Sequence, residues 1–242
     1  MSKKDRIMEL SDQLNELQLP FMAASLESLF HSKDYDALDT LTILERIIEA
    51  EYQEKQSQKF QNRLKRAHLA GGTQCIDHCR DSNERIYLPA DITSTLSSLV
   101  FIKDGLNVCI LGPSDSGKSY LAKALGIQAC LKYRTSYHHC EELLETMVAL
   151  KQSDYQKKVR FFIKLDLLIL DDFLLHTITD EREIKVLFEL LEKRSELNRS
   201  TIVCSQREPS SWASMILNDE VSENAILKRA TKHYTVVIRP RD

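Results

Sequence analysis

A glycine-rich octapeptide near the middle of this 242-residue chain restricts its fold more than any other segment. The octapeptide reads Gly112-Pro113-Ser114-Asp115-Ser116-Gly117-Lys118-Ser119. It fits the pattern G-x-x-x-x-G-K-S/T of a phosphate-binding loop, whose glycines let successive backbone N–H groups point at phosphate oxygens. Lys118 then reaches the β- and γ-phosphates, and Ser119 offers a hydroxyl to Mg²⁺ at a helix N-terminus that favours anions. The octapeptide therefore predicts a site for a nucleoside triphosphate with Mg²⁺.

The segments on either side of the loop have the periodicity that this motif requires. Residues 107–111 form a short apolar run typical of a buried parallel strand, and Tyr120 begins a stretch with helical spacing. Further strands are predicted at about 134–138, 166–170, 201–205 and 235–238. Five such strands separated by helices predict an α/β fold with a five-stranded parallel sheet flanked by helices.

The first 70 residues show helical periodicity and predict a small all-helical N-terminal domain. Thr42 and Glu45 have the spacing of a capping box, which predicts that a long helix starts there. Two glycines then open a linker that we assign to residues 71–85, and Asp91 is expected to cap a short helix. The nucleotide-binding core is expected over residues 86–242, with no helical lid after its last strand.

Charge and composition narrow the class of protein. The net charge is −3 and the pI is near 6.2, so any contact with nucleic acid must use a local basic surface. No apolar run is long enough to span a membrane, and the N-terminus lacks the apolar core of a signal peptide. We therefore expect a cytoplasmic protein with no membrane partner. The Cys75–Cys79 cluster lacks a second ligand pair for zinc, and His138-His139-Cys140 is interpreted as strand-end packing.

Basic residues accumulate at the end of the long helix, and no acidic residue lies among them after Glu54. They are Lys55, Lys59, Arg63, Lys65 and Arg66. One interpretation is a solvated helix face with cations near its C-terminus, where the helix dipole favours them. The other is an arm that contacts the phosphates of nucleic acid. Composition alone leaves both interpretations open.

Two carboxylates, Asp171 and Asp172, end the apolar run that predicts the strand at 166–170. ATP hydrolysis needs one carboxylate for the Mg²⁺ shell and another that orients or deprotonates the attacking water. Asp171 suits the first role and Asp172 the second. The next predicted strand ends at Ser205 and Gln206, and strand tips in such sheets line the ligand crevice. Either side chain is a candidate for contact with the γ-phosphate or the water.

A helical stretch near the C-terminus, residues 225–230, carries the adjacent cations Lys228 and Arg229. In one interpretation Arg229 reaches the γ-phosphate of a neighbouring subunit, where such an arginine gives a large gain in hydrolysis rate. In the other interpretation the two cations face DNA or solvent.

Taken in order, these motifs resemble the IstB-like ATPases, the transposition helper proteins of insertion sequences within the AAA+ class. The resemblance rests on the phosphate loop, the Asp-Asp strand, the Ser-Gln strand tip and the Ile-Leu-Lys-Arg segment. Residues 17–23 also resemble the family's L-x-L-x-x-M-A opening, and residues 49–67 resemble its long basic helix. The resemblance therefore covers nearly the whole chain.

This resemblance implies a P-loop AAA+ core and ATP-dependent assembly of a homo-oligomer on double-stranded DNA. It also implies DNA bending and cooperation with a transposase in the selection of the target. By the same resemblance, residues 112–120, which include Tyr120, bind ATP, and Ser119 and Asp171 bind Mg²⁺.

The resemblance also suggests roles for the remaining candidates. Asp172 becomes the residue that activates water, and Gln206 or Ser205 becomes the γ-phosphate sensor. Arg229 becomes the arginine that acts in trans, and the basic residues at 55–66 become candidates for DNA contact.

The chain departs from the family pattern at three places. Asp115 stands where a glycine is usual, and it either weakens nucleotide binding by its charge or replaces a glycine of positive φ with a tolerated aspartate. Leu174 stands where a glycine commonly follows the acidic pair, and the family's tail after the last strand is missing. We therefore expect ATP turnover that is slow or that depends on DNA and a partner.

Three other functions are alternatives. A replicative helicase loader of the DnaC type shares the core and the acidic pair, but it would prefer single-stranded DNA and a helicase partner. A nucleotide-switched adaptor with little hydrolysis fits Asp115 and the short C-terminus. A small-molecule kinase would need a substrate lid and an acceptor pocket, and the sequence shows neither.

Overall fold

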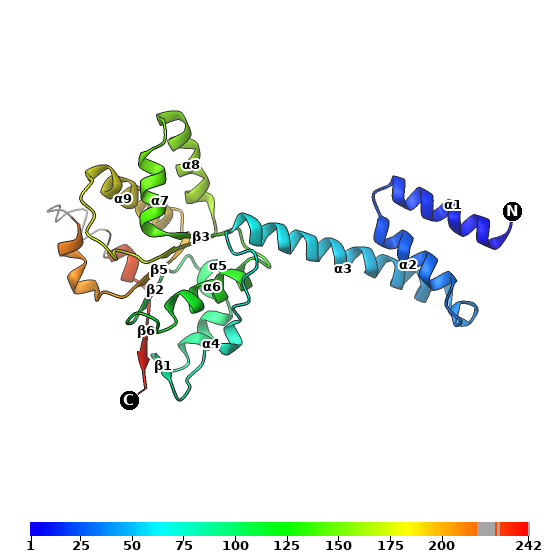
Figure 1. Ribbon diagram of the computed structural model, residues 1–242, viewed down its shortest axis with the longest axis horizontal. Helices are drawn as coiled ribbons and strands as arrows, with labels where there is room; N and C mark the ends of the chain where they lie inside the picture. The colour runs from blue at the N-terminus through cyan, green and yellow to red at the C-terminus, as the bar shows by residue number, and fades with distance from the viewer. Residues whose placement is uncertain (217–225, 227, 242) are drawn as a thin grey trace. The chain divides into compact units, whose positions relative to one another are not determined.

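The computed structural model describes residues 1–216, 226 and 228–241 (Figure 1). The chain divides into two compact units, Met1–Asn62 and Arg63–Asp242. The boundary between the units falls inside the helix α3, Thr40–Arg66. Each unit is described separately below.

Helices form the first unit: α1 (Lys3–Glu16), α2 (Pro20–Phe30), the short η1 (Tyr35–Ala37) and most of α3. Its small core holds Ile7, Leu26 and Ile47, one from each main helix. The N-cap residue of α2 is Leu19, whose apolar side chain makes no capping hydrogen bond. The buried carboxylate of Glu51 in α3 accepts hydrogen bonds from the Phe21 and Met22 N–H groups at 2.9 and 3.1 Å instead. A side chain of α3 therefore satisfies the free donors at the start of α2.

Two predicted helix caps are wrong in detail. The helix α3 begins at Thr40, and the Asp39 carboxylate accepts from the Leu41 and Thr42 N–H groups at 2.9 and 3.1 Å. The Thr42 hydroxyl donates to Asp39 and does not itself cap the helix. Asp91 does precede a helix, α4 (Ile92–Ser97), but it has a φ of 59° and its side chain makes no capping hydrogen bond.

A six-stranded sheet forms the centre of the second unit, with strand order β1-β6-β2-β5-β4-β3. The strands are β1 (Arg85–Leu88), β2 (Val108–Leu111), β3 (Thr135–His139), β4 (Leu167–Asp171), β5 (Ser200–Ser205) and β6 (Tyr234–Pro240). The predicted α/β class and the five parallel strands are confirmed. The whole sheet has six strands and not the predicted five, because the short strand β1 pairs antiparallel with β6 at the edge.

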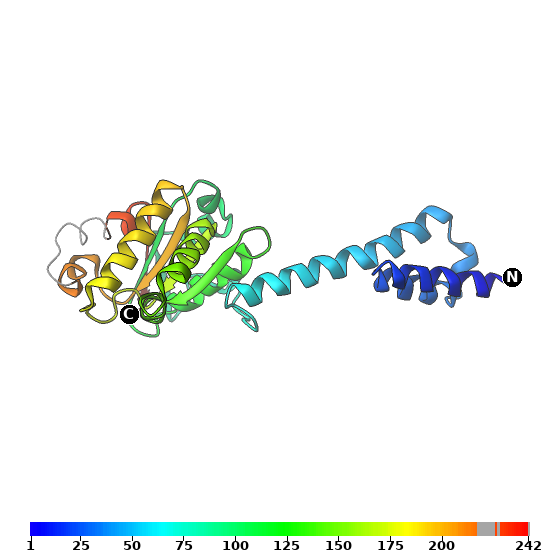
Figure 2. The ribbon, with the colours of Figure 1, turned by 90° about the horizontal axis from the view of Figure 1, so that it is seen from above.

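Helices cover both faces of this sheet (Figures 1 and 2). They are α4, α5 (Val100–Lys103), α6 (Lys118–Ala129), α7 (Cys140–Val148), α8 (Gln152–Lys164) and α9 (Glu181–Glu196), with short turns at η2 (Ile76–His78), η3 (Pro209–Ser211) and η4 (Ala213–Met215). The helices α7, α8 and α9 pack against one face, in a core that includes Leu168 and Leu170. Alternate residues of a strand point to opposite faces, so Leu167 and Ile169 face α6. The strand β4 is consequently buried on both sides.

The parallel strands place the predicted site residues at the carboxyl-terminal ends of the strands. The phosphate loop follows β2, the two aspartates come at the end of β4, and Ser205 ends β5. Carboxyl ends of parallel strands are where ligands bind in open α/β sheets. Among the helices of the described residues, none is long and apolar enough to cross a membrane.

The buried Arg194 holds three elements of the core together. Its side chain is fully buried at the end of α9 and donates to the carbonyls of Phe162 and Leu165 at 2.5 and 3.0 Å. It also donates to the Ser200 carbonyl and to the Thr201 hydroxyl, the latter at 3.0 Å. One guanidinium thus joins α9 to the end of α8 and to the start of β5.

Replacement of Arg194 by alanine is expected to lower the free energy of unfolding by about 3 kcal/mol, since it leaves buried carbonyls without donors. Urea unfolding followed by circular dichroism measures the change. The control is Lys185→Ala on the same helix, which removes an exposed ion pair with Glu181 at 3.9 Å and should have a much smaller effect. Equal losses in the two variants would contradict this assignment.

Candidate nucleotide-binding site

The two glycines of the loop are required by the close approach of neighbouring groups. A Cβ atom at Gly112 would lie 2.5 Å from the Ile238 carbonyl oxygen. A Cβ at Gly117 would lie 2.5 Å from Nη1 of Arg85. Gly117 itself has a φ of 100° at the start of α6. Only glycine fits both positions without displacing β6 or Arg85.

Two positions where the family resemblance expects glycine have left-handed backbone in this chain. Asp115 has a φ of 60°, and Leu174 has a φ of 51°. Aspartate tolerates this region better than most residues because its short side chain hydrogen-bonds locally. For the buried Leu174 the same conformation is strained. The loop and the turn after β4 therefore keep the backbone shape that a glycine would give.

Lys118 is enclosed by the loop that precedes it. Its side chain is 8% exposed, and Nζ donates to the Pro113 carbonyl at 2.7 Å. Arg85 of β1 donates to the Ser116 carbonyl at 3.3 Å, so the missed strand also supports the loop. The lysine lies at the first turn of α6, where a phosphate would meet both its charge and the helix N-terminus.

One pocket brings together residues from three strand ends. Its lining consists of Ser114, Asp115, Gly117, Lys118, Ser119, Tyr120, Asp172 and Gln206. The structure thus places the predicted loop next to the second aspartate and one of the two sensor candidates. Ser205 instead is buried, and its hydroxyl accepts a hydrogen bond from the Arg207 N–H at 3.2 Å.

The two aspartates at the end of β4 have different environments. Asp171 is 1% exposed and accepts a hydrogen bond from the Tyr137 hydroxyl on one oxygen and from the Asp172 N–H on the other, at 3.0 Å. Burial and the neighbouring Asp171 raise the pKa of Tyr137, so this phenol stays protonated as a donor. The Asp172 side chain is 43% exposed, and its Oδ2 lies 2.9 Å from Nδ1 of His139.

The two histidines of β3 do not share one role, although both were predicted to pack at a strand end. His138 is largely buried, bonds to the Ser136 hydroxyl at 2.8 Å and contacts the ring of Phe162. Burial lowers the pKa of His138 to about 4, which keeps it neutral. His139 and Tyr137, on the opposite face of β3, contact the two aspartates, and sequence reasoning missed both. Their spacing of two residues puts both on one face of β3, but only the pairing of β3 with β4 brings that face to the aspartates.

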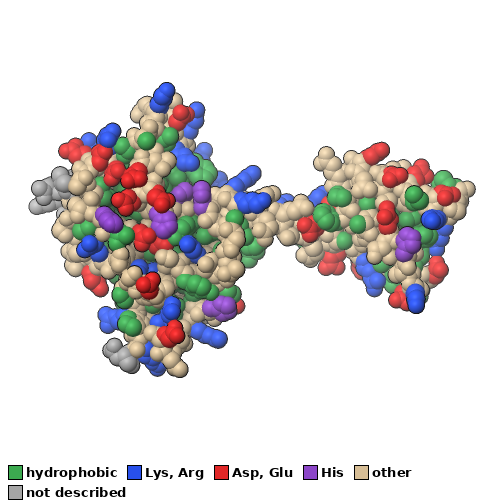
Figure 3. Space-filling model, in the orientation of Figure 1, with side chains coloured by type: hydrophobic (Ala, Val, Ile, Leu, Met, Phe, Trp, Pro, Cys, Tyr) green, Lys and Arg blue, Asp and Glu red, His purple; other side chains and the backbone are tan. Residues whose placement is uncertain are grey.

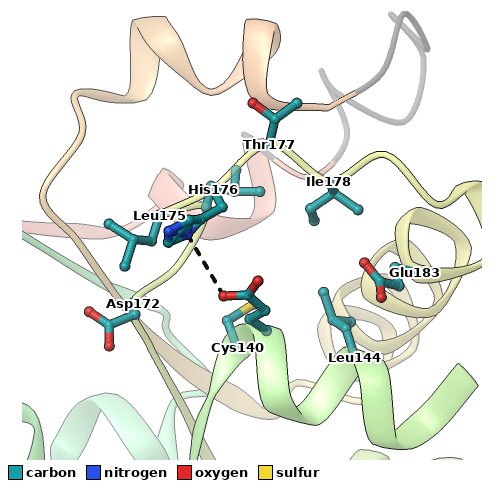
Figure 4. Close-up of a pocket in the computed structure, with 10 residues that line it drawn as sticks. Cys140, Leu144, Asp172, Leu175, His176, Thr177, Ile178 and Glu183 are labelled. Atoms are coloured by element: carbon teal, nitrogen blue, oxygen red, sulfur yellow. Dashed lines mark ion pairs between the residues drawn. The ribbon is translucent and has the colours of Figure 1, made fainter. Parts of the chain in front are cut away.

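A second pocket adjoins the first and shares Asp172 with it (Figure 4). It lies between the start of α7, the chain after β4 and the start of α9, and apolar side chains such as Leu144 and Ile178 line it. His176 Nδ1 lies 3.8 Å from the Glu141 carboxylate at its rim. Asp and Glu side chains gather over this part of the surface (Figure 3). Burial is the main cause that raises the pKa of Glu183, and the negative charges of neighbouring acids raise it further.

Arg229 does not line the pocket of the phosphate loop in its own chain. Residues 228–231 are helical, whereas Ala225 and Leu227 of the predicted segment lie outside the described residues. The Arg229 guanidinium lies 3.1 Å from the Glu192 carboxylate and over the ring of Phe188. Lys228, Arg229 and Lys232 line a separate pocket.

The predicted DNA-contact residues have different partners. Arg63 donates to the carbonyls of Cys130 and Leu131 at 3.2 and 2.5 Å, at the end of α6. Lys55 lies 3.2 Å from Glu51. The remaining three, Lys59, Lys65 and Arg66, are exposed. No group of three or more metal-ligating side chains is present among the residues that the structure describes, the Cys75–Cys79 segment included.

The fold and the site together indicate the class of this protein. A phosphate loop between β2 and α6 and two acids at the end of β4 are features of a P-loop protein that binds a nucleoside triphosphate. Residues 12–240 match the sequence model of the family described as "IstB-like ATP binding protein". The chain therefore belongs to the IstB-like ATP-binding family.

Individual proteins agree with this assignment. The "Putative insertion sequence ATP-binding protein y4iQ/y4nD/y4sD" of Sinorhizobium fredii is 26% identical over 229 residues, which are 94% of this chain and 76% of the relative. Among solved structures, the replication initiator DnaA bound to AMPPCP and single-stranded DNA has a TM-score of 0.55 at 21% identity, over 69% of this chain and half of DnaA. The DnaC helicase loader has a TM-score of 0.52 at 18% identity, over 69% of this chain and 97% of the loader. These two likenesses concern the fold.

Replacement of Asp115 by asparagine is expected to tighten ATP binding about fivefold, because it removes a negative charge whose repulsion of a phosphate charge is worth about 1 kcal/mol at 4 Å with water-like screening. Asparagine also tolerates positive φ, so the backbone is preserved. Asp115→Gly serves as the matched comparison, and calorimetric titration with ATP measures both affinities. Tightening by glycine but not by asparagine would show that backbone strain, not charge, limits binding.

Proposed function

We propose that the chain is an ATP-dependent DNA-binding helper of transposition that hydrolyses ATP, assembles on double-stranded DNA and cooperates with a transposase in target selection. The observation that carries the proposal is the pocket that Asp172 and Gln206 share with the phosphate loop. Membership in the IstB-like family and the insertion-sequence relative support the link with transposition.

In this proposal the loop binds the triphosphate. Backbone N–H groups of residues 112–120 and the Lys118 ammonium contact the phosphates. The Ser119 hydroxyl, which lines the loop pocket, and the Asp171 carboxylate, which is buried one residue before Asp172 and does not line that pocket, are oxygen donors of the kind that Mg²⁺ prefers. Waters would complete the shell of the ion. Bound Mg²⁺ would neutralise charge on the β- and γ-phosphates.

Hydrolysis then requires a group that handles the attacking water. Asp172 is partly exposed and faces the loop pocket, so it suits the role of orienting the water and accepting its proton. Gln206 lines the same pocket and is the stronger sensor candidate, since the Ser205 hydroxyl is buried. Arg229 lies outside this pocket, which suits action on a neighbouring subunit in a homo-oligomer.

For DNA contact we retain Lys55, Lys59, Lys65 and Arg66, and we assign Arg63 to the attachment of α3 to α6. Exposed cations on a helix can approach phosphates without desolvation of buried groups. Lys55 is the weakest of the four because Glu51 already pairs with it.

DNA binding with size analysis tests the main proposal. Large complexes are expected on duplex DNA with ATP, and smaller or no complexes with ADP or without nucleotide. The triple variant Lys59→Ala, Lys65→Ala, Arg66→Ala should weaken binding and reduce the slope of log affinity against log salt by about 3.

Two controls accompany this experiment. Lys185→Ala removes one exposed cation elsewhere and should leave the slope unchanged, and Arg63→Ala should lower thermal stability more than it alters the slope. A preference for single-stranded DNA would favour the helicase loader instead. Nucleotide binding without assembly or turnover would favour the adaptor.

A mixing experiment tests Arg229. Arg229→Ala and Lys118→Ala are each expected to lower ATP hydrolysis at least about 100-fold, and mixing the two variants should restore part of it. Restoration arises because an intact loop in one subunit meets an intact arginine from its neighbour. Glu192→Gln is the matched control, since it removes the ion-pair partner of Arg229 but keeps the arginine. No restoration on mixing would contradict action in trans.

A further inference from the structure

Asn107, the residue before β2, makes four hydrogen bonds and is buried, with 6% of its surface exposed. Its side-chain Nδ2 donates to the Arg229 carbonyl at 2.7 Å, and its Oδ1 accepts from the Thr201 N–H at 2.8 Å. Its backbone N–H donates to Nδ1 of His233 at 3.0 Å, and its carbonyl accepts from the Tyr234 N–H at 3.0 Å. Three of the four bonds therefore hold the segment that carries Arg229.

The amide group of asparagine suits this position because it donates and accepts at the same time. The Arg229 carbonyl needs a donor and the Thr201 N–H needs an acceptor, and one side chain provides both. A buried backbone group that is left without a partner costs free energy. Replacement of Asn107 by alanine would therefore detach both groups from the start of β2, whereas the two backbone bonds of residue 107 would remain.

The carbonyl that Asn107 holds belongs to the last turn of a helix. Residues 228–231 are helical, and the last carbonyls of a helix generally lack a donor from within the helix. The Asn107 amide supplies a donor from the sheet, so it fixes the position of this turn relative to β2. The Arg229 side chain leaves the same turn, pairs with Glu192 and lies over the ring of Phe188. The place from which the guanidinium extends thus depends on the bond to Asn107.

Asn107 lies at the opposite end of β2 from the phosphate loop. Asn107 and Gly112 are five residues apart, which corresponds to about 16 Å along a strand. Both Asn107 and Arg229 lie outside the set of residues that line the loop pocket. A change at Asn107 should consequently alter the arginine that a subunit offers to its neighbour, and not the nucleotide site of its own chain.

We propose that Asn107 is a positioning residue for ATP hydrolysis in trans, which fixes the helical turn that presents Arg229 to the nucleotide of a neighbouring subunit. The inference rests on the proposed function, in which Arg229 acts on a neighbour. His233 supports the same turn, since its ring accepts the hydrogen bond from the Asn107 N–H.

Steady-state ATP hydrolysis by the full chain with Mg²⁺ and duplex DNA tests the proposal. Asn107→Ala should lower kcat about 10-fold and leave KM for ATP within about twofold, because the arginine is misplaced while the loop is intact. His233→Ala should lower kcat about threefold by the same route. His233 is exposed, so this second variant keeps the test valid if Asn107→Ala fails to fold.

A matched control removes a different buried hydrogen bond near the start of β5. The Ser200 hydroxyl donates to the Phe101 carbonyl at 2.9 Å and makes no contact with the Arg229 segment in the described part of the chain. Ser200→Ala should therefore have the kcat of the wild type. A wild-type kcat in both Asn107→Ala and His233→Ala would overturn the inference.

Mixing of variants distinguishes a misplaced arginine from a damaged core. In an equal mixture of Asn107→Ala and Lys118→Ala, about a quarter of the interfaces join an intact loop to a well-placed arginine, so about a quarter of the wild-type rate should return. In a mixture of Asn107→Ala and Arg229→Ala no arginine is well placed, and the rate should stay low. Restoration in the second mixture, or none in the first, would overturn this inference alone. Failure of Arg229→Ala and Lys118→Ala to complement each other would overturn the proposed action in trans as well.

Hydrogen exchange measured by mass spectrometry tests the contact without turnover. Amides in a peptide that spans residues 228–234 should exchange about 10-fold faster in Asn107→Ala than in the wild type, because the turn loses a bond to the sheet. Ser200→Ala should leave the exchange of this peptide unchanged, although it also loses a buried bond. Equal protection in Asn107→Ala and the wild type would overturn the inference, and melting curves of each variant confirm that it is folded.

Discussion

The parallel pairing of β2, β5 and β4 is the constraint on which the rest of the site depends. Leu111 lies opposite Ser205, and Leu170 lies opposite Val203, so the three strands end at one edge of the sheet. Because a strand rises about 3.3 Å per residue, a slip of two residues in β4 would move Asp172 by about 6.6 Å relative to the loop. The residues that would bind phosphate, hold Mg²⁺ and act on water therefore meet only through strand register.

Around this edge the backbone adopts conformations that local preference disfavours. Asp115, Asp172 and Leu174 all have positive φ, and none of them is a glycine. Such positions persist when surrounding structure determines them, as the Phe173 N–H bond to β5 does for the turn after β4. At Asp115 and Leu174 the chain thus keeps a backbone conformation that glycine adopts readily, while it gains a side chain at each point.

Strong local signals made much of this arrangement predictable. Apolar runs predicted β2, β4 and β5, because a strand buried on both faces has few polar residues to obscure it. The strand β1 has four residues and lies at the sheet edge, so its sequence carries little periodicity. The contacts of Tyr137 and His139 depend on the register of β3 with β4, and the buried bonds of Arg63 and Arg194 depend on which carbonyls the fold presents. No spacing within one segment encodes those pairings.

The capping of α2 by Glu51 has a consequence for the way the N-terminal unit reaches its native state. The carboxylate that satisfies the first turn of α2 comes from about 30 residues further along the chain. Helix α2 cannot complete its own N-terminal hydrogen bonds, so its order depends on a helix made later during synthesis. A nascent chain that ends before Glu51 would hold a frayed α2, and the three helices would gain their full stability together, once α3 has emerged.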